Sequence, residues 1–267
     1  MNRIHLFEFT DLTWYPQTFR RMQTDYLQFA AGMGAGHQNL IPLFARAMQN
    51  ASTTQIIDLC SGSGGPWRHL QEQLKQAGLP ATVTLTDQFP DPVTVQKWAS
   101  AGHQDIHYLP TPVDALHLPP HLSGMRTLFE GFHHFRPIQA RLILQDAFQN
   151  RSPIGIFEAR LKPPFGLPLL VLSPIITLLT YLLITPFMKP LYPARLLWTY
   201  LLPIVPLATC WDGIVSLLRV YSPADLQALT APLQRADYVW ETGLASTGTP
   251  IFDFAYLLGY PAKAKDP

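Results

Sequence analysis

The stretch TTQIIDLCSGSGGP, residues 53–66, decides the fold of this 267-residue chain. Its first half is a β-branched and apolar run that is typical of a buried strand. Its second half holds three glycines, at positions 62, 64 and 65. Glycines directly behind a strand form either an ordinary turn or a loop whose backbone approaches a ligand, with free helix N–H groups behind it. The loop alone leaves both interpretations open.

Strands and helices alternate from this stretch onwards. The pattern predicts strands over residues 54–60, 81–87, 106–114, 125–135 and 153–159, and helices over residues 66–78, 91–102 and 137–150. Residues 15–50 in front of them have helical spacing, interrupted by glycines at 32, 34 and 36. Such alternation predicts a parallel sheet covered by helices on both faces, with ligands bound beyond the carboxyl ends of the strands.

Acidic residues end the first three predicted strands. Asp58 lies at the end of the first strand, Asp87 ends the second, and Asp114 ends the third. A carboxylate at the second position can accept hydrogen bonds from both hydroxyls of a ribose, and one at the third can accept from an adenine amino group. The fourth strand ends in EGFHHFRP, which places Glu130, His133 and neighbouring residues near the mouth of the sheet.

This ordered series resembles the class I S-adenosylmethionine-dependent methyltransferases over residues 52–160 and 221–260. One departure is Cys60, which stands where that family usually has a glycine. The resemblance implies S-adenosylmethionine as cofactor. The residues that it assigns to the cofactor are Asp58, Cys60, Gly62, Ser63, Gly64, Asp87, Gln88, Asp114, Ala115, Glu130 and Phe132.

The predicted fold is an α/β three-layer, Rossmann-like sheet of seven strands, of which the last is antiparallel. Residues 1–50 are expected to form an N-terminal helical cap. Residues 51–160 and 220–262 are expected to form the cofactor-binding domain, and residues 161–219 an apolar helical insertion between the fifth and sixth strands.

The residues after the fourth strand and within the insertion carry the expected chemistry. A histidine can act as a base near neutral pH. His133 and His134 would point to opposite faces if the strand continued through them, so at most one would face the cofactor. Asp212 and Tyr221 are the other catalytic candidates, and the expected substrate-binding residues are Tyr15, Arg20, Trp211 and Arg219. A buried Asp212–Arg219 ion pair is the structural alternative. We predict no metal site, because no acid or cysteine completes the histidine pairs 103/107 and 117/121.

Residues 165–188 contain no charged side chain and are long enough to cross a bilayer as a helix. Because predicted strands lie on both sides of the insertion, it must return to the side on which it started. A shallow membrane hairpin contacting lipid through residues 165–209, an apolar cap over the site and a homodimer interface all stay open. Each of them favours a small lipophilic acceptor.

Composition narrows the remaining choices. The net charge of +1 predicts no nucleic-acid partner. Two cysteines and an N-terminus without an apolar run favour the cytoplasm, including the inner face of a membrane. The expected function is methylation of a small hydrophobic acceptor at O or N. A non-catalytic cofactor-binding protein is one alternative, and a nicotinamide-dependent oxidoreductase is another, although Trp67 stands where G-x-G-x-x-G needs its third glycine.

Overall fold

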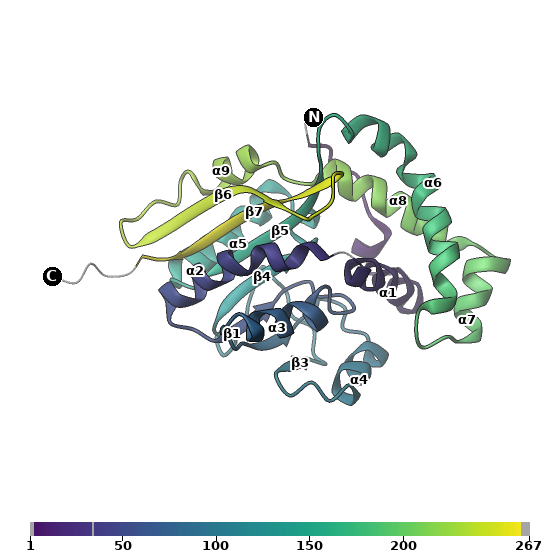
Figure 1. Cartoon of the computed structure of the whole chain (residues 1–267), viewed down its shortest axis with the longest axis horizontal. Coiled ribbons are helices and arrows are strands. Elements are labelled where there is room, and N and C mark those ends of the chain that lie inside the picture. The colour runs from purple at the N-terminus through teal and green to yellow at the C-terminus, as the bar shows by residue number, and fades with distance from the viewer. Residues whose placement is uncertain (1–2, 34, 263–267) are drawn as a thin grey trace.

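The computed structural model describes residues 3–33 and 35–262, and it contains one seven-stranded sheet with helices on both faces (Figure 1). The strands are β1 (Gln55–Asp58), β2 (Thr82–Leu85), β3 (Ile106–Tyr108), β4 (Met125–Phe129), β5 (Ile154–Leu161), β6 (Tyr238–Ser246) and β7 (Phe252–Pro261). The α-helices are α1 (Gln17–Met33), α2 (Ile41–Ala51), α3 (Trp67–Gln76), α4 (Pro92–Ser100), α5 (Pro137–Gln149), α6 (Gly166–Ile184), α7 (Pro193–Leu196), α8 (Ile204–Arg219) and α9 (Pro223–Thr230). Shorter turns are η1 (Phe9–Asp11), η2 (Ala35–Leu40), η3 (Phe132–His134), η4 (Thr185–Phe187) and the π-helical η5 (Leu197–Leu201).

The strand order confirms the predicted fold. It runs β3-β2-β1-β4-β5-β7-β6, with β1 to β5 parallel and β7 antiparallel to both of its neighbours. The apolar insertion lies between β5 and β6, as predicted. From β1 the chain continues to β2 and β3 on one side of the sheet, and it then crosses to β4 on the other side of β1. The carboxyl ends of β1 and β4 therefore flank the crevice in which such sheets bind ligands.

Two predicted strands extended six residues too far. β3 ends at Tyr108, before Pro110 and Pro112, because proline has no N–H to donate to a neighbouring strand. β4 ends at Phe129 because Glu130 adopts a left-handed backbone conformation with φ +51°. The chain then forms the short 3-10 turn η3 where the fourth strand was expected to continue.

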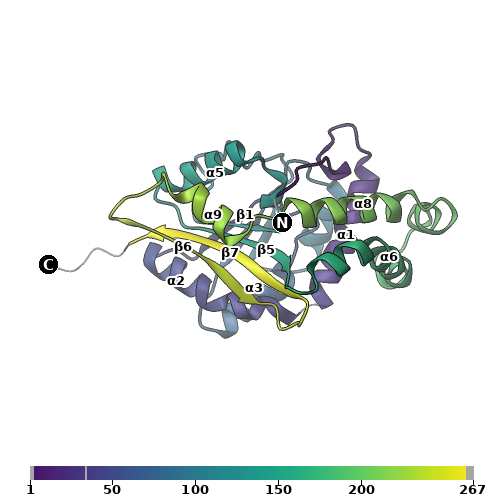
Figure 2. The ribbon, with the colours of Figure 1, turned by 90° about the horizontal axis from the view of Figure 1, so that it is seen from above.

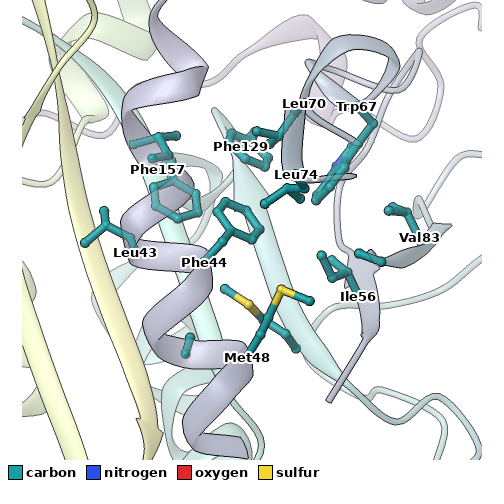
Figure 3. Close-up of a cluster of buried hydrophobic side chains, with 14 of the residues drawn as sticks. Leu43, Phe44, Met48, Ile56, Trp67, Leu70, Leu74, Val83, Phe129 and Phe157 are labelled. Carbon is teal, nitrogen blue, oxygen red and sulfur yellow. The ribbon is translucent and has the colours of Figure 1, made fainter. Parts of the chain in front are cut away.

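Aromatic side chains fill the layer between the sheet and the helices α2, α3 and α4. Phe44 of α2 stacks on Phe157 of β5 with ring centroids 5.5 Å apart, and its ring meets Trp67 of α3 edge-on at 6.0 Å (Figure 3). Helices α5 and α9 cover the opposite face around Leu128 and Leu257. Helix α2 therefore packs on the sheet, although the sequence predicts it as part of a cap over residues 1–50.

Helix α1 instead packs against the insertion. The rings of Tyr26 and Tyr181 stack at 4.7 Å, and the Tyr181 hydroxyl donates to the Met22 carbonyl at 3.2 Å. Arg195 of α7, fully buried, forms an ion pair with Asp25 of α1. As Figures 1 and 2 show, α1, α6 and α8 lie together at one end of the molecule, and α2 and β6 lie towards the other.

Candidate functional site

The loop after β1 has a conformation that suits close backbone approach. Cys60 has φ +58°, Gly62 φ +54°, Gly64 φ +106° and Gly65 φ +47°. Glycine adopts these values without the steric cost that a side chain imposes. Cys60 takes a left-handed conformation at the position where the resembling family usually has glycine, so the turn is retained although the residue differs.

Asp58 serves the protein itself. Its carboxylate is buried and accepts hydrogen bonds from Thr127 Oγ1 and Ser61 Oγ, both at 2.7 Å. Burial raises the pKa of Asp58 to about 6, although these two hydrogen bonds lower it. Asp58 therefore ties the loop to β4 and shows no free face to a ligand.

Asp87 lies at the edge of the glycine loop. Its Oδ2 accepts a hydrogen bond from the Gly62 N–H at 2.8 Å, and its Oδ1 accepts one from the Phe89 N–H at 2.8 Å. A carboxylate has about four lone-pair directions, so this half-buried side chain keeps capacity for further donors. Gln88 beside it is exposed. The structure thus brings the loop and the predicted ribose-binding acid together.

The loop after β3 joins the same edge. The Val113 N–H donates to the Asp87 carbonyl at 2.9 Å, which places Asp114 and the half-buried Ala115 next to the end of β2. Asp114 accepts from the Leu116 N–H at 2.9 Å and lies 2.8 Å from His117 Nδ1. The three strand-end acids are therefore in the order that the sequence predicted.

Helix α1 covers the glycine loop, a contact that the sequence did not reveal. Thr24 Oγ1 lies 2.8 Å from Ser63 Oγ, and Gln28 Nε2 donates to the Ser63 carbonyl at 2.5 Å. Ser63 Oγ also donates to Asp25 Oδ1 at 3.1 Å. Because these partners are about 40 positions away in the chain, no local sequence pattern signals them.

His133 forms a buried pair with Glu158, from the carboxyl half of β5. His133 Nδ1 lies 2.6 Å from Glu158 Oε2, and the Phe132 and His133 N–H groups donate to Glu158 Oε1 at 2.6 and 3.2 Å. Burial raises the pKa of Glu158, but the charge and hydrogen bond of His133 outweigh it and lower the pKa overall. A proton on Nδ1 satisfies the contact with the Glu158 carboxylate, and in that tautomer the lone pair lies on Nε2, which has no hydrogen-bond partner.

His134 has different partners. Its Nδ1 lies 2.6 Å from Asp11 Oδ1 and 3.8 Å from Glu8 Oε2. The rings of His133 and His134 stack at 4.4 Å. The expectation that the two side chains point to opposite faces was wrong, because η3 replaces the continued strand. Glu130 is exposed and accepts from the Ala159 N–H at 2.6 Å, whereas Phe132 is buried in the core.

The polar residues of α8 hold the N-terminal segment, residues 3–12. Asp212 accepts hydrogen bonds from the Phe9 N–H at 2.8 Å and the Thr10 N–H at 3.3 Å. Arg219 Nη1 lies 2.9 Å from Glu8 Oε1 and 2.8 Å from Asp11 Oδ2. The alternative of a direct Asp212–Arg219 ion pair is therefore wrong, since each side chain binds this segment instead.

The other predicted residues of this region are also engaged in structural contacts. Trp211 Nε1 donates to the Phe7 carbonyl at 3.0 Å, and the Tyr221 hydroxyl donates to the Phe135 carbonyl at 2.8 Å. Arg20 donates to the Thr10 and Leu12 carbonyls at 3.2 and 2.7 Å. Tyr15 is buried beside them, and its hydroxyl has no hydrogen-bond partner.

Ligand atoms of metal-binding type do gather at this site. One group is Glu8, His133 and His134, and the other is Glu130, His133 and Glu158, with the atoms of each group within 4.8 Å of one another. Glu8 is already neutralised by Arg219 at 2.9 Å, and a guanidinium so close opposes a second cation. Glu158 already accepts three hydrogen bonds. These contacts favour a hydrogen-bonded network over a metal centre.

We expect the free energy of unfolding to decrease as pH rises from 6.5 to about 9. Burial lowers the pKa of His134, but the negative charges of Glu8 and Asp11 outweigh it and raise the pKa from 6.5 to about 9. The folded state then binds more protons than the unfolded state across this interval, with a slope of at most about 1.4 kcal/mol per pH unit.

Urea denaturation at several pH values measures this slope. His134→Asn should flatten it, whereas His107→Asn, at an exposed position of β3, should leave it unchanged. A slope that persists in His134→Asn would contradict the assignment.

Solved structures provide the comparison with known proteins, since no family model and no curated protein matches the chain. The plantazolicin methyltransferase BpumL, solved in complex with SAH, superposes with a TM-score of 0.51 at 11% identity over 91% of this chain and 95% of that chain. Human N-acetylserotonin methyltransferase, solved in complex with SAM, superposes with a TM-score of 0.50 at 11% identity over 91% of this chain and 56% of that chain. Likeness at this identity bears on the fold: the chain has the fold of the class I S-adenosylmethionine-dependent methyltransferases.

Proposed function

We propose that this protein is an S-adenosylmethionine-dependent methyltransferase that acts on a hydroxyl or amine of a small hydrophobic acceptor. The observation that carries this proposal is the His133–Glu158 pair beside the carboxyl ends of β1 and β4, with His133 Nε2 buried and without a partner. In the tautomer with the proton on Nδ1, the Nε2 atom of His133 is placed to accept a proton from the methyl acceptor.

The residues at the strand ends fit the cofactor. The glycine loop follows β1 with positive φ at four positions, so the backbone can approach the methionine part of the cofactor. Asp87 would accept hydrogen bonds from the ribose hydroxyls, and the Asp114 loop, which is bound to the end of β2, would contact the adenine. When bound, S-adenosylmethionine supplies a methyl group that a positively charged sulfur already activates.

The protein's own contribution is to align the acceptor and take up its proton. His133 Nε2 would receive the proton of the attacking O–H or N–H group, and Glu158 would stabilise the resulting imidazolium through Nδ1. Glu8 Oε1 lies 3.7 Å from His133 Nε2 and covers it, so the acceptor must displace Glu8 or bind beside it. The N-terminal segment would then take part in acceptor binding.

The lipophilic character of the acceptor is inferred from the surroundings of this segment. Phe7 and Trp211 pack together at 5.3 Å, and Phe9 contacts Tyr15 at 5.6 Å. Phe7 and Phe9 flank Glu8 on both sides along the chain. A segment that moves would therefore expose aromatic surface to the acceptor, which favours an apolar molecule with one polar group.

Replacing Asp87 tests the cofactor site. We expect Asp87→Asn to weaken binding of S-adenosylmethionine and its demethylated product at least tenfold in calorimetric titration, because one acceptor pair for the ribose hydroxyls is lost. The matched control is Asp105→Asn. Asp105 is exposed and lies directly before β3, at the amino-terminal end of the strands, opposite to the end that carries Asp87. If folded wild-type protein binds neither compound, or if both variants bind equally well, the proposed function is wrong.

A further inference from the structure

The insertion carries many large apolar side chains on the outside of the molecule. Its large exposed side chains, defined here as the apolar surface, are Leu167, Val171, Leu172, Ile175, Ile176, Leu179, Leu183, Phe187, Leu197, Leu201, Leu202, Ile204 and Leu207. They belong to α6, η4, η5 and the first turn of α8, except Leu202, which lies in the link between η5 and α8. Exposed patches of such extent on a soluble protein mark a surface that is covered by a partner or a membrane.

Helix α6 and the turn after it have the length and composition of a membrane span. Gly166–Phe187 is long and apolar enough to cross a membrane by itself. Pro193–Leu201 and Ile204–Arg219 meet the same criterion only together, and they are bent by 71° relative to each other. The core helix of a soluble protein can be equally long and apolar but is mostly buried, whereas only 6% of the most apolar 18 residues within Gly166–Phe187 are buried. Burial inside the protein therefore does not explain this composition.

The connections and contacts of the insertion favour a position on the surface of a bilayer over a crossing. β5 and β6, which flank it in the chain, belong to one sheet. Asp212 and Arg219 bind the second half of α8 to the N-terminal segment. Along α6, the Tyr26 hydroxyl lies 2.8 Å from Thr180 Oγ1, and Cys210 Sγ donates to the Pro174 carbonyl at 3.2 Å. Helix α6 is thus attached sideways to α1 and α8, as Figures 1 and 2 show, and only its outer side can meet lipid.

The distribution of exposed side chains favours lipid over a protein partner. At 3.6 residues per turn, the exposed positions from Leu167 to Leu183 extend over about half of the circumference of α6. A second copy or a partner helix covers a narrower stripe and brings a polar rim. Residues 165–188 contain no charged side chain, and the exposed Lys189 follows directly. A lysine at the end of an apolar segment can extend its ammonium group to lipid phosphates.

We propose that the apolar surface docks the protein on one leaflet of a phospholipid bilayer, with α6 lying in the plane of the membrane. This proposal does not depend on methyl transfer. It also places the site close to the membrane, because Arg195 of the insertion binds Asp25, and Asp25 accepts from Ser63 of the glycine loop. On the basis of the proposed function, a lipophilic acceptor would then reach the site from the bilayer.

Flotation with phosphatidylcholine vesicles, without cofactor or acceptor, tests the proposal. The test variant is Val171→Glu/Leu183→Glu/Leu201→Glu, at positions that are 67, 69 and 74% exposed. The matched control is Ile138→Glu/Leu142→Glu/Leu244→Glu, at positions 79, 49 and 50% exposed on α5 and β6, outside the apolar surface. All six side chains are exposed, so both variants are expected to fold, which circular dichroism and thermal melting will verify.

We expect the wild type and the control to float with the vesicles, and the test variant to lose at least tenfold in the bound fraction. Wild-type protein that stays at the bottom of the gradient would overturn the proposal, as would a folded test variant that floats like the wild type. Analytical ultracentrifugation without vesicles tests whether a second copy of the chain covers the apolar surface instead. A wild-type dimer that does not float, and that the same triple substitution turns into a monomer, would identify a second copy as the partner.

Discussion

His133→Gln is expected to lower kcat for methyl transfer by about two to three orders of magnitude, while the Kd for S-adenosylmethionine changes less than about threefold. The reason is that glutamine keeps a donor towards Glu158 but cannot take a proton at the position of Nε2. The assay follows transfer of a labelled methyl group from S-adenosylmethionine to solvent-extractable products of a lipid extract, and titration calorimetry measures Kd separately.

Two controls distinguish a base from a structural residue. The rate of His133→Gln should rise with pH more steeply than that of the wild type, because hydroxide can replace the missing base. His134→Asn should lower kcat less than about tenfold, since the Nδ1 of His134 is already engaged with Asp11 at 2.6 Å. Equal losses in the two variants, or a His133→Gln enzyme with wild-type kcat, would refute the role of His133 as a base.

Arg219→Met is expected to lower the free energy of unfolding by about 3–5 kcal/mol at neutral pH. Arg219 is only 1% exposed and pairs with Glu8 and Asp11, and its guanidinium also donates to the Leu6 carbonyl. Methionine fills a similar volume but leaves Glu8, itself 2% exposed, without its cation. Urea denaturation measures the change.

The matched control is Arg235→Met. The Arg235–Asp237 pair spans 3.0 Å, like the pairs of Arg219, but its side chains are 43 and 38% exposed. Because exposed pairs contribute about 0–1 kcal/mol, we expect a loss below about 1 kcal/mol. If the two substitutions cost the same, the cluster around Arg219 contributes no more than a surface ion pair.

Much of the fold could be predicted because its signals are local. The β-branched run before Asp58, the glycines behind it and the alternation of strands and helices each depend on residues close together in the chain. The order of acids at the strand ends also follows, because parallel strands bring their carboxyl ends to one edge. The end of β4 was missed, since nothing local in EGFHH signals the left-handed conformation of Glu130.

Of the proposed base and its partner, the sequence indicated only the first. His133 was a candidate from its place after the fourth strand. Glu158 was not among the candidates, although an acid in the carboxyl half of a predicted strand is a signal that could have identified it. Glu8 and Asp11 carried no signal at all, because they meet His133 and His134 from more than 120 positions away.

The sequence by itself determined the layered α/β architecture, the place of the glycine loop and the apolar insertion, since each rests on periodicity or on backbone preference within a few residues. Only the tertiary structure decided which polar residues face one another. The buried network of Glu8, Asp11, His133, Glu158 and Arg219 is assembled from the N-terminal segment, η3, β5 and α8. Burial makes an unpaired charge costly, so these groups are satisfied only when all four segments meet, and that condition has no counterpart in the local sequence.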